Sequence, residues 1–227
     1  MMHMEINHSP EPIRLFKSDF LEFFTHIHPA VVVAIWLPVA VYFLALSIVS
    51  RPAGGSALHI PLGFCVGLFV WTLTEYLVHR FVFHYEPKSE MAKRIFFLFH
   101  GVHHAQPQCK TRLVMPPVVS IPGALLIFIL FSLVIGSLLG APQWVAPIFS
   151  GFTLGYLVYD MVHYATHHLP MYGQVMKYLK RYHMLHHFKT PEKRYGVSSP
   201  LWDFVFRTEP GEERGESRGM ERPIREA

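Results

Sequence analysis

Ten histidines in four clusters are the residues of this chain whose type and spacing could do chemistry. The sequence has sixteen histidines among 227 residues. The clusters are His79 and His84; His100, His103 and His104; His163 and His167; and His183, His186 and His187. Neutral imidazole suits iron, zinc, copper and nickel as a ligand. Ten imidazoles are about what two metal ions need if each takes roughly five protein ligands, so we predict a centre of two metal ions.

The spacing within the clusters indicates which helix faces carry these ligands. Positions i, i+3 and i+4 lie on one side of an α-helix. The triplets that begin at His100 and at His183 are therefore each expected to converge on one point. His163 and His167 form an i, i+4 pair on a further helix.

The pair formed by His79 and His84 is less regular. The two residues are five apart, which is about 140° around an ideal helix. They share a face only if the helix ends or distorts near Phe83. His168 is five residues from His163 and is expected to be a neighbour of the centre rather than a ligand.

Two carboxylates fit a supporting shell around the ligands. Glu75 lies four residues before His79, and Asp160 lies three residues before His163, so each shares a helix face with a candidate ligand. A carboxylate that accepts the second imidazole N–H fixes the tautomer and the orientation of the ring. The alternative is a carboxylate at a helix end beside water. We predict no catalytic residue beyond the metal ligands.

Composition favours a membrane protein. Hydrophobic residues make up 51% of the chain, and the mean hydropathy is +0.27. Residues 113–159 contain no charged side chain. As a helix this run is roughly 70 Å long, which is too long for one crossing of a ~30 Å hydrocarbon core and suits two. The two cysteines, Cys65 and Cys109, offer neither a disulfide framework nor a thiolate metal site.

Uncharged runs predict four membrane-spanning helices in two hairpins. The predicted spans are 31–49, 52–74 with a continuation to His84, 117–140 and 144–163. Turns are expected at 51–56 and 140–143. We therefore predict an all-α integral membrane protein with a cytosolic, histidine-rich helical cap that holds the two metal ions. Its parts are an N-terminal cytosolic segment (1–28), a membrane domain (29–208) and a disordered charged tail (209–227).

The distribution of basic residues predicts the orientation. Four crossings place all the histidine clusters on one face of the membrane. Of the 20 lysines and arginines, only Arg51 lies in a loop on the opposite face. The excess of positive charge in cytoplasmic loops then assigns the histidine face to the cytoplasm, in a bacterial inner membrane or the endoplasmic reticulum. A soluble protein with buried helices is the alternative, but it does not readily accommodate so long an uncharged run.

The histidine segments resemble the fatty acid hydroxylase superfamily. They read HRFVFH at 79–84, HGVHH at 100–104, HYATHH at 163–168 and HMLHH at 183–187. The H-x4-H spacing of the first segment and GVSSPLWD at 196–203 are most similar to the fatty acid 2-hydroxylases. Sterol desaturases and sterol methyl oxidases usually carry H-x3-H instead. The resemblance covers about residues 62–208.

This resemblance implies a membrane mono-oxygenase that uses O2 to hydroxylate C2 of a fatty acyl chain. The acyl chain could be free, a thioester or part of a sphingolipid. The ten clustered histidines would hold two metal ions, taken to be iron; zinc could occupy the isolated protein but lacks redox chemistry. Only about 28 residues precede the first span, too few for a haem domain. Electrons are therefore expected from a separate donor, either of cytochrome b5 type or a ferredoxin with its reductase. No nucleic-acid partner is expected.

Two other functions remain open at this point. A sterol or carotenoid oxidase, or a desaturase, could use the same scaffold. The other is a non-enzymatic metal transporter or metal sensor; transport would need polar residues near the middle of the spans, and the sequence instead places the histidines at one end of them. Tyr164, Tyr182, Tyr195 and Trp202 are expected either to line the opening for a lipid or to anchor the protein at the membrane interface.

Overall fold

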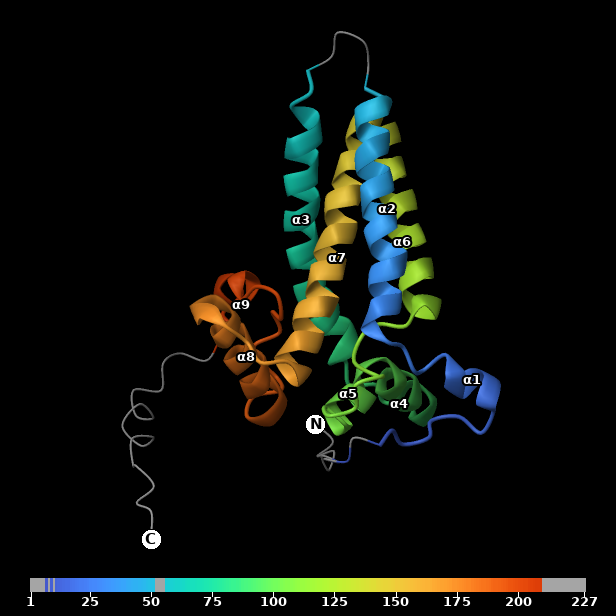
Figure 1. The fold of residues 1–227 in the computed structure, drawn as a ribbon, viewed down its shortest axis with the longest axis vertical. Helices are drawn as coiled ribbons and strands as arrows, with labels where there is room; N and C mark the ends of the chain where they lie inside the picture. Colours follow the sequence, from blue (N-terminus) through green and yellow to red (C-terminus); the bar gives the residue numbers. More distant parts are fainter. Residues whose placement is uncertain (1–6, 8, 10, 52–55, 210–227) are drawn as a thin grey trace.

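The computed structural model describes residues 7, 9, 11–51 and 56–209 of the chain (Figure 1). All regular elements within this part are helices. Most of the predicted turn at 51–56 and nearly all of the predicted tail at 209–227 lie outside the described residues.

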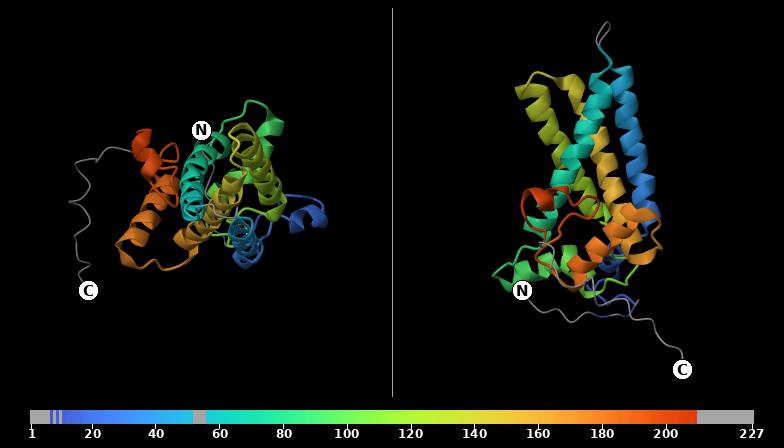
Figure 2. Two further views of the ribbon diagram at one scale, coloured as in Figure 1. Left: turned by 90° about the horizontal axis from the view of Figure 1, so that it is seen from above. Right: turned by 90° about the vertical axis from the view of Figure 1, so that its left-hand side faces the viewer.

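Four helices are long and apolar enough to cross a membrane, as predicted. The four candidate spans are α2 (Pro29–Val49); α3 (His59–Val78) with η1 (His79–Phe83); α6 (Pro117–Phe131) with η3 (Ser132–Leu138); and η4 (Pro142–Trp144) with α7 (Val145–His168). They stand side by side as a bundle (Figures 1 and 2).

The span boundaries follow from local sequence. The His28 side chain caps α2 by accepting the N–H of Ala30 at 3.2 Å, and Pro29 occupies the first helical position. Pro117 begins α6 in the same way. Proline suits these positions because its ring fixes a helical φ and the first N–H of a helix has no partner within it. Gly140 has a φ of +63° in the predicted turn at 140–143, a conformation open to glycine.

Helix α7 is the centre of the bundle. It packs mainly against α3 and α2. These contacts are more extensive than those within either hairpin, that is, between α2 and α3 or between α6 and α7. Within the most apolar stretch of each span, 72% of residues are buried in α7 but only 6% in α6. The helix that carries His163 and His167 is thus the one most tightly held by its neighbours.

Small residues allow α3 and α7 to approach closely. A Cβ added to Gly67 would lie 2.0 Å from the carbonyl oxygen of Ile148, and one added to Gly151 would lie 2.0 Å from that of Phe64.

We expect Gly151→Val to lower the free energy of unfolding by more than about 3 kcal/mol, because backbone atoms cannot move aside as a side chain can. Thermal unfolding in detergent measures this. Gly123→Val is the matched control, since no atom lies within 4 Å of its added Cβ; equal losses in both variants would refute the packing argument.

The remaining helices gather at one end of the bundle and form a cap (Figure 1). They are α1 (Asp19–Phe23), α4 (Glu90–Phe96), η2 (Phe97–Gly101), α5 (Val102–Ala105), α8 (Gly173–Phe188) and α9 (Leu201–Val205). All four histidine clusters lie in or beside this cap. The predicted fold, an all-helical protein with four apolar helices and a histidine-rich cap, is confirmed.

Candidate metal centre

The described part of the chain contains two groups of histidines that could each hold a metal ion. Within each group, one ring nitrogen of every member lies within 4.8 Å of the others. Group one is His79, His84, His100, His104 and His186; group two is His103, His163, His167, His183 and His187. The structure thus brings together all ten histidines singled out in the sequence, in two sets of five.

The expectation that each triplet converges on one point is wrong. In the first triplet, His100 and His104 belong to group one and His103 to group two. The second triplet is divided the opposite way, with its middle histidine, His186, in group one. Successive helical residues are about 100° apart, so positions i and i+4 differ by only ~40° whereas i+3 and i+4 differ by ~100°. Each triplet therefore gives an i, i+4 pair to one group and its middle histidine to the other.

A π-helical turn allows His79 and His84 to join the same group. The N–H of His84 donates to the carbonyl of His79 at 3.1 Å, the i+5 to i hydrogen bond of a π-helix. The wider turn brings residues five apart onto one side, and the two ring centroids are 5.0 Å apart. The distortion that this pair requires is present in η1 (His79–Phe83).

The distances between ring nitrogens fit ligands of a common metal ion. The Nε2 atoms of His100 and His104 lie 3.0 Å apart, and those of His167 and His183 lie 2.9 Å apart. Imidazole binds such metals at about 2.1 Å, so two ligands at right angles would have nitrogens about 3.0 Å apart. A structural zinc site uses four ligands in a tetrahedron. The five donors in each group fit a transition-metal ion whose coordination number is higher than four.

Burial favours the neutral form of these imidazoles. It lowers the pKa of His100, His104 and His186 well below the usual range, and neighbouring histidines lower the pKa further. Burial likewise lowers the pKa of His103 and His183 in group two. A neutral imidazole keeps one nitrogen lone pair, which is what a metal ion requires.

Backbone carbonyls fix the rings of two members of group one. The Nδ1–H of His79 donates to the carbonyl of Tyr195 at 2.5 Å, and that of His186 donates to the carbonyl of Lys193 at 2.6 Å. A carbonyl only accepts, so the proton is on Nδ1 and the lone pair is on Nε2. Arg194, between the two carbonyls, has a φ of 60°. This left-handed conformation is uncommon for arginine, and it occurs where the chain presents both carbonyls to group one.

The expected hydrogen bond between Glu75 and the His79 ring is not formed. Glu75 instead holds the loop whose carbonyl group accepts from that ring. Its buried carboxylate accepts the N–H groups of Val197 at 2.6 Å and Ser198 at 2.8 Å, together with the Ser198 hydroxyl. The second nitrogen of His79 is instead taken by the Tyr195 carbonyl. Glu75 lies four residues before His79, but a loop more than 100 residues later supplies the acceptor for the ring.

Asp203 is a supporting residue that sequence reasoning missed. Its buried carboxylate accepts the N–H groups of Tyr195 at 2.9 Å and Gly196 at 2.7 Å and the hydroxyl of Thr208 at 2.7 Å. It therefore fixes the same loop at the two residues before those that Glu75 holds. The signal was present in the GVSSPLWD segment, of which Asp203 is the last residue.

We expect Glu75→Ala to weaken metal binding by group one about 10- to 100-fold, the usual cost of losing a partner that orients a ligand. Glu75→Gln should lose much less, because its amide oxygen can still accept the two loop N–H groups. Competition with a chelator measures the affinity. Glu90→Gln is the control, since Glu90 pairs with Lys93 on the exposed side of α4. Equal affinities of Glu75→Ala and wild type would contradict this role.

Asp160 also has partners other than a histidine. It accepts the hydroxyl of Tyr156 at 2.8 Å and the N–H of Met115 at 3.3 Å. The Nδ1 of His163 has no hydrogen-bond partner among the described residues. The expected contact between Asp160 and His163 is therefore corrected: the carboxylate ties the segment before α6 to α7. It lies in the wall of the cavity that reaches the histidines.

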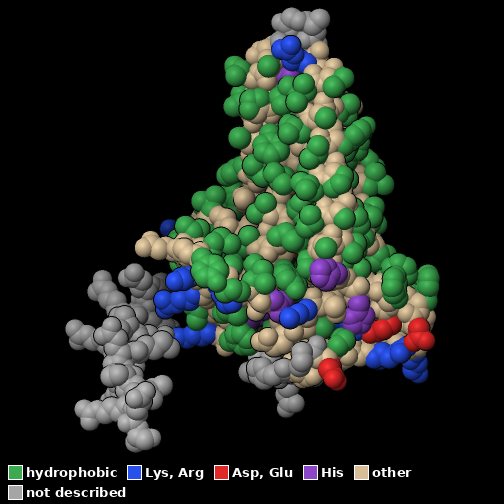
Figure 3. Space-filling model, in the orientation of Figure 1, with side chains coloured by type: hydrophobic (Ala, Val, Ile, Leu, Met, Phe, Trp, Pro, Cys, Tyr) green, Lys and Arg blue, Asp and Glu red, His purple; other side chains and the backbone are tan. Residues whose placement is uncertain are grey.

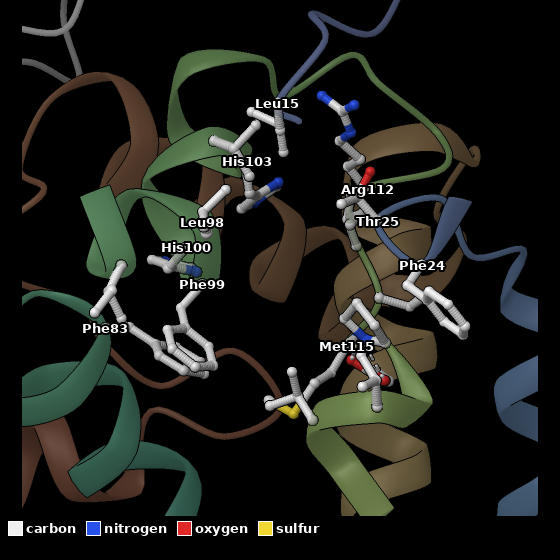
Figure 4. Close-up of a pocket in the computed structure, with 18 of the residues that line it drawn as sticks. Leu15, Phe24, Thr25, Phe83, Leu98, Phe99, His100, His103, Arg112 and Met115 are labelled. Carbon is white, nitrogen blue, oxygen red and sulfur yellow. Dashed lines mark hydrogen bonds between the residues drawn. The ribbon is translucent and has the colours of Figure 1, made fainter. Parts of the chain in front are cut away.

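A cavity of about 320 Å³ leads to both histidine groups (Figure 4). His100 of group one and His103 and His163 of group two lie in its wall. Most of the other lining side chains are apolar, among them Leu98, Phe99 and Met115 in Figure 4. A cavity of this size and polarity is typical of a site for an apolar ligand.

The aromatic residues expected at the lipid opening do not line this cavity. Tyr182 and Tyr195 are buried. The Trp202 indole donates to the hydroxyl of Thr72 at 3.0 Å. Tyr164 packs against His168, with ring centroids 4.9 Å apart.

His168 lies beside the centre without joining it, as its spacing predicted. It belongs to neither histidine group. Its ring centroid is 6.0 Å from that of His167, so it is an immediate neighbour of a group-two histidine.

Known proteins share both the sequence and the fold of this chain. The sequence model of the fatty acid hydroxylase family matches residues 64–208. Dihydroceramide fatty acyl 2-hydroxylase FAH2 of Arabidopsis thaliana is 41% identical over 198 residues, which cover 87% of this chain and 80% of that protein. Ceramide very long chain fatty acid hydroxylase SCS7 of Saccharomyces cerevisiae is 40% identical over 200 residues, 84% of this chain and 48% of that protein.

A solved structure agrees with these sequence relatives. It is described as full-length scs7p with only the hydroxylase domain visible, and it is 38% identical to this chain. The alignment has a TM-score of 0.77 and covers 85% of this chain and 70% of the other. The chain belongs to the fatty acid hydroxylase family, and it is therefore an oxidoreductase enzyme.

Proposed function

We propose that this protein is an O2-dependent membrane mono-oxygenase that hydroxylates C2 of a fatty acyl chain. The observation that carries the proposal is one apolar cavity whose wall includes histidines of both five-membered groups. An acyl chain in this cavity would have its reacting carbon beside the candidate metal centre. Relatives named as fatty acyl and ceramide hydroxylases support the substrate class.

The ten histidines are proposed as ligands of two metal ions, one in each group, and iron is the metal proposed. Iron would supply the redox chemistry with O2 that a C–H hydroxylation requires, which zinc cannot. The chain's own residues position the ligands. The Tyr195 and Lys193 carbonyls orient His79 and His186, while Glu75 holds the loop that contains Tyr195.

The cavity walls are proposed to bind the acyl chain and exclude water from the reacting carbon. Leu98, Phe99 and Val114 supply apolar surface for the methylene groups. Arg112 and Asp160 are the charged side chains in the wall. Both already have partners in the fold: Glu22 for Arg112, and Tyr156 for Asp160. The cavity thus favours a chain without charge along its length.

The orientation and the redox partner also belong to this proposal. Six of the lysines and arginines lie between Arg80 and Arg112, and seven lie between Lys177 and Arg207. Both segments are at the cap end of the bundle, which supports a cap that faces the cytoplasm. Electrons are proposed to come from a separate donor protein. Residues 29–208 would form the membrane domain.

Lipid analysis after expression tests the function. We expect 2-hydroxy acyl chains to appear in cells that produce the protein and to be absent from cells with the empty vector. Altered sterols or carotenoids with unchanged acyl chains would overturn the substrate assignment in favour of another oxidase on this fold. Weak, variable metal loading that exchanges freely, with no lipid product, would indicate metal handling instead.

A further inference from the structure

The residues of the cavity wall that are exposed at the surface all have apolar side chains. Five residues of its wall are also exposed at the surface, and we call them the rim: Leu21, Phe24, Ile95, Phe99 and Val118. They come from α1 and the residue that follows it, from the α4–η2 segment and from the start of α6. The buried wall beyond them reaches the histidines. An opening to water would expose this apolar ring at a free-energy cost.

Helix α1 has its phenylalanines on the outside. Phe20 is 72% exposed and Phe23 is 71% exposed. Both contact the rim residue Phe24, with ring centroids 5.1 and 5.5 Å apart. The three rings form one aromatic cluster that continues the rim outward. Figure 4 shows Phe24 across the cavity from His100.

The polar contacts of α1 hold it in this orientation. The Glu22 carboxylate faces inward, where it accepts the N–H groups of Leu15 at 3.0 Å and Phe16 at 2.8 Å. It also pairs with the buried Arg112 at 2.5 Å. Asp19, which is exposed, pairs with Arg14. A helix on a water-facing surface turns its apolar side inward; here a carboxylate is turned inward and two phenylalanines are turned outward.

The aromatic cluster adjoins the apolar surface of the bundle. Val118 of the rim is the second residue of α6, the span with the smallest buried share. The exposed face of α6 continues from there through Ile121 and Leu125. Figure 3 shows hydrophobic side chains along the bundle and on the cap beside its base; charged side chains lie mainly on the part of the cap farther from the bundle and at the opposite tip of the bundle. Helices whose phenylalanines lie on the side opposite to their charged residues are found at the boundary between lipid head groups and acyl chains.

We propose that α1 is inserted into the bilayer boundary through Phe20 and Phe23, and that the rim opens to lipid rather than to water. The acyl chain of a bilayer lipid then reaches the histidines sideways, between α1 and the base of α6, without passing through water. The identity of the chain as substrate rests on the proposed function. The placement of α1 rests on its own surface and on the neighbouring span.

Spin labels in lipid nanodiscs test the placement. Labels are attached at Phe20→Cys and at Phe23→Cys in a Cys65→Ser background, since Cys65 is exposed and Cys109 is buried. The reference positions are Leu126→Cys, on the exposed face of α6, and Lys177→Cys, on the exposed side of α8. We expect both α1 labels to collide readily with oxygen and to lose access to a water-soluble nickel chelate, as the Leu126 label does. Access to nickel like that at Lys177 would overturn the proposal. Protection from both reagents would also overturn it, since it would indicate a protein partner.

A second measurement tests the route of the acyl chain. Val118→Trp narrows the rim and is expected to reduce turnover of a bilayer-embedded acyl substrate without loss of bound metal. Leu126→Trp, on the same helix but away from the rim, should leave turnover unchanged. Unchanged turnover in Val118→Trp would overturn this route. If wild type forms no hydroxylated lipid, the proposed function fails, while the spin labels still decide where α1 lies.

Discussion

Replacing His103 or His186 with alanine is expected to lower lipid hydroxylation by more than about 100-fold. Loss of a residue that only orients a ligand costs 10- to 100-fold, and loss of a proposed ligand should cost more. The two residues are the middle histidines of the triplets, so His103→Ala disrupts group two and His186→Ala disrupts group one. Each variant should retain less than the wild-type amount of metal, and product analysis with metal analysis measures both effects.

His168→Ala is the matched control for these variants. His168 belongs to the same cap and lies next to His167 but belongs to neither group. We expect it to keep both its metal and most of its activity. Hydroxylated lipid that persists in both His103→Ala and His186→Ala would show that these histidines are not ligands of the reacting centre.

Removal of one bound metal ion is expected to lower the Tm by roughly 8–16 °C. An ion bound at 1,000 times its dissociation constant stabilises the folded state by about 4 kcal/mol. For a chain of this size, each kcal/mol shifts the Tm by roughly 2–4 °C. The two groups join α7, α8 and the segments around η1 and α5, so without metal the contacts between spans and cap weaken.

Thermal unfolding before and after chelation measures this stabilisation. Return of iron to the chelated protein should restore the original Tm, which controls for irreversible damage during chelation. An unchanged Tm after complete removal of metal would mean that the histidine groups hold together without an ion. That result would contradict the proposal that bound metal strengthens the contacts between the spans and the cap.

Local pattern in the sequence identified the four apolar helices and the ten clustered histidines. Charge-free length and helical spacing are properties of neighbouring residues, so both are visible along the chain. The division of the histidines between two groups was not predicted. Helical spacing separates His103 and His186 from the outer pair of their triplets, but which group each residue joins depends on how separate helices pack together.

The partners of the carboxylates could not be predicted for a similar reason. Glu75 and Asp160 were predicted to share a helix face with candidate ligands. Their hydrogen-bond partners, such as Val197 for Glu75 and Met115 for Asp160, are distant in sequence. The cavity rim likewise combines residues from three separate segments. Only the packing of these segments reveals which aromatic residues surround the opening.

The central claim is that the two histidine groups serve the hydroxylation of an acyl chain by O2. The most direct test is incubation of the purified, iron-loaded protein in lipid with an electron donor, an acyl substrate and 18O2, followed by mass spectrometry of the product. The account predicts a 2-hydroxy acyl chain that carries one 18O atom at C2. A product hydroxylated with oxygen from water, or labelled sterol with unlabelled acyl chains, would contradict it.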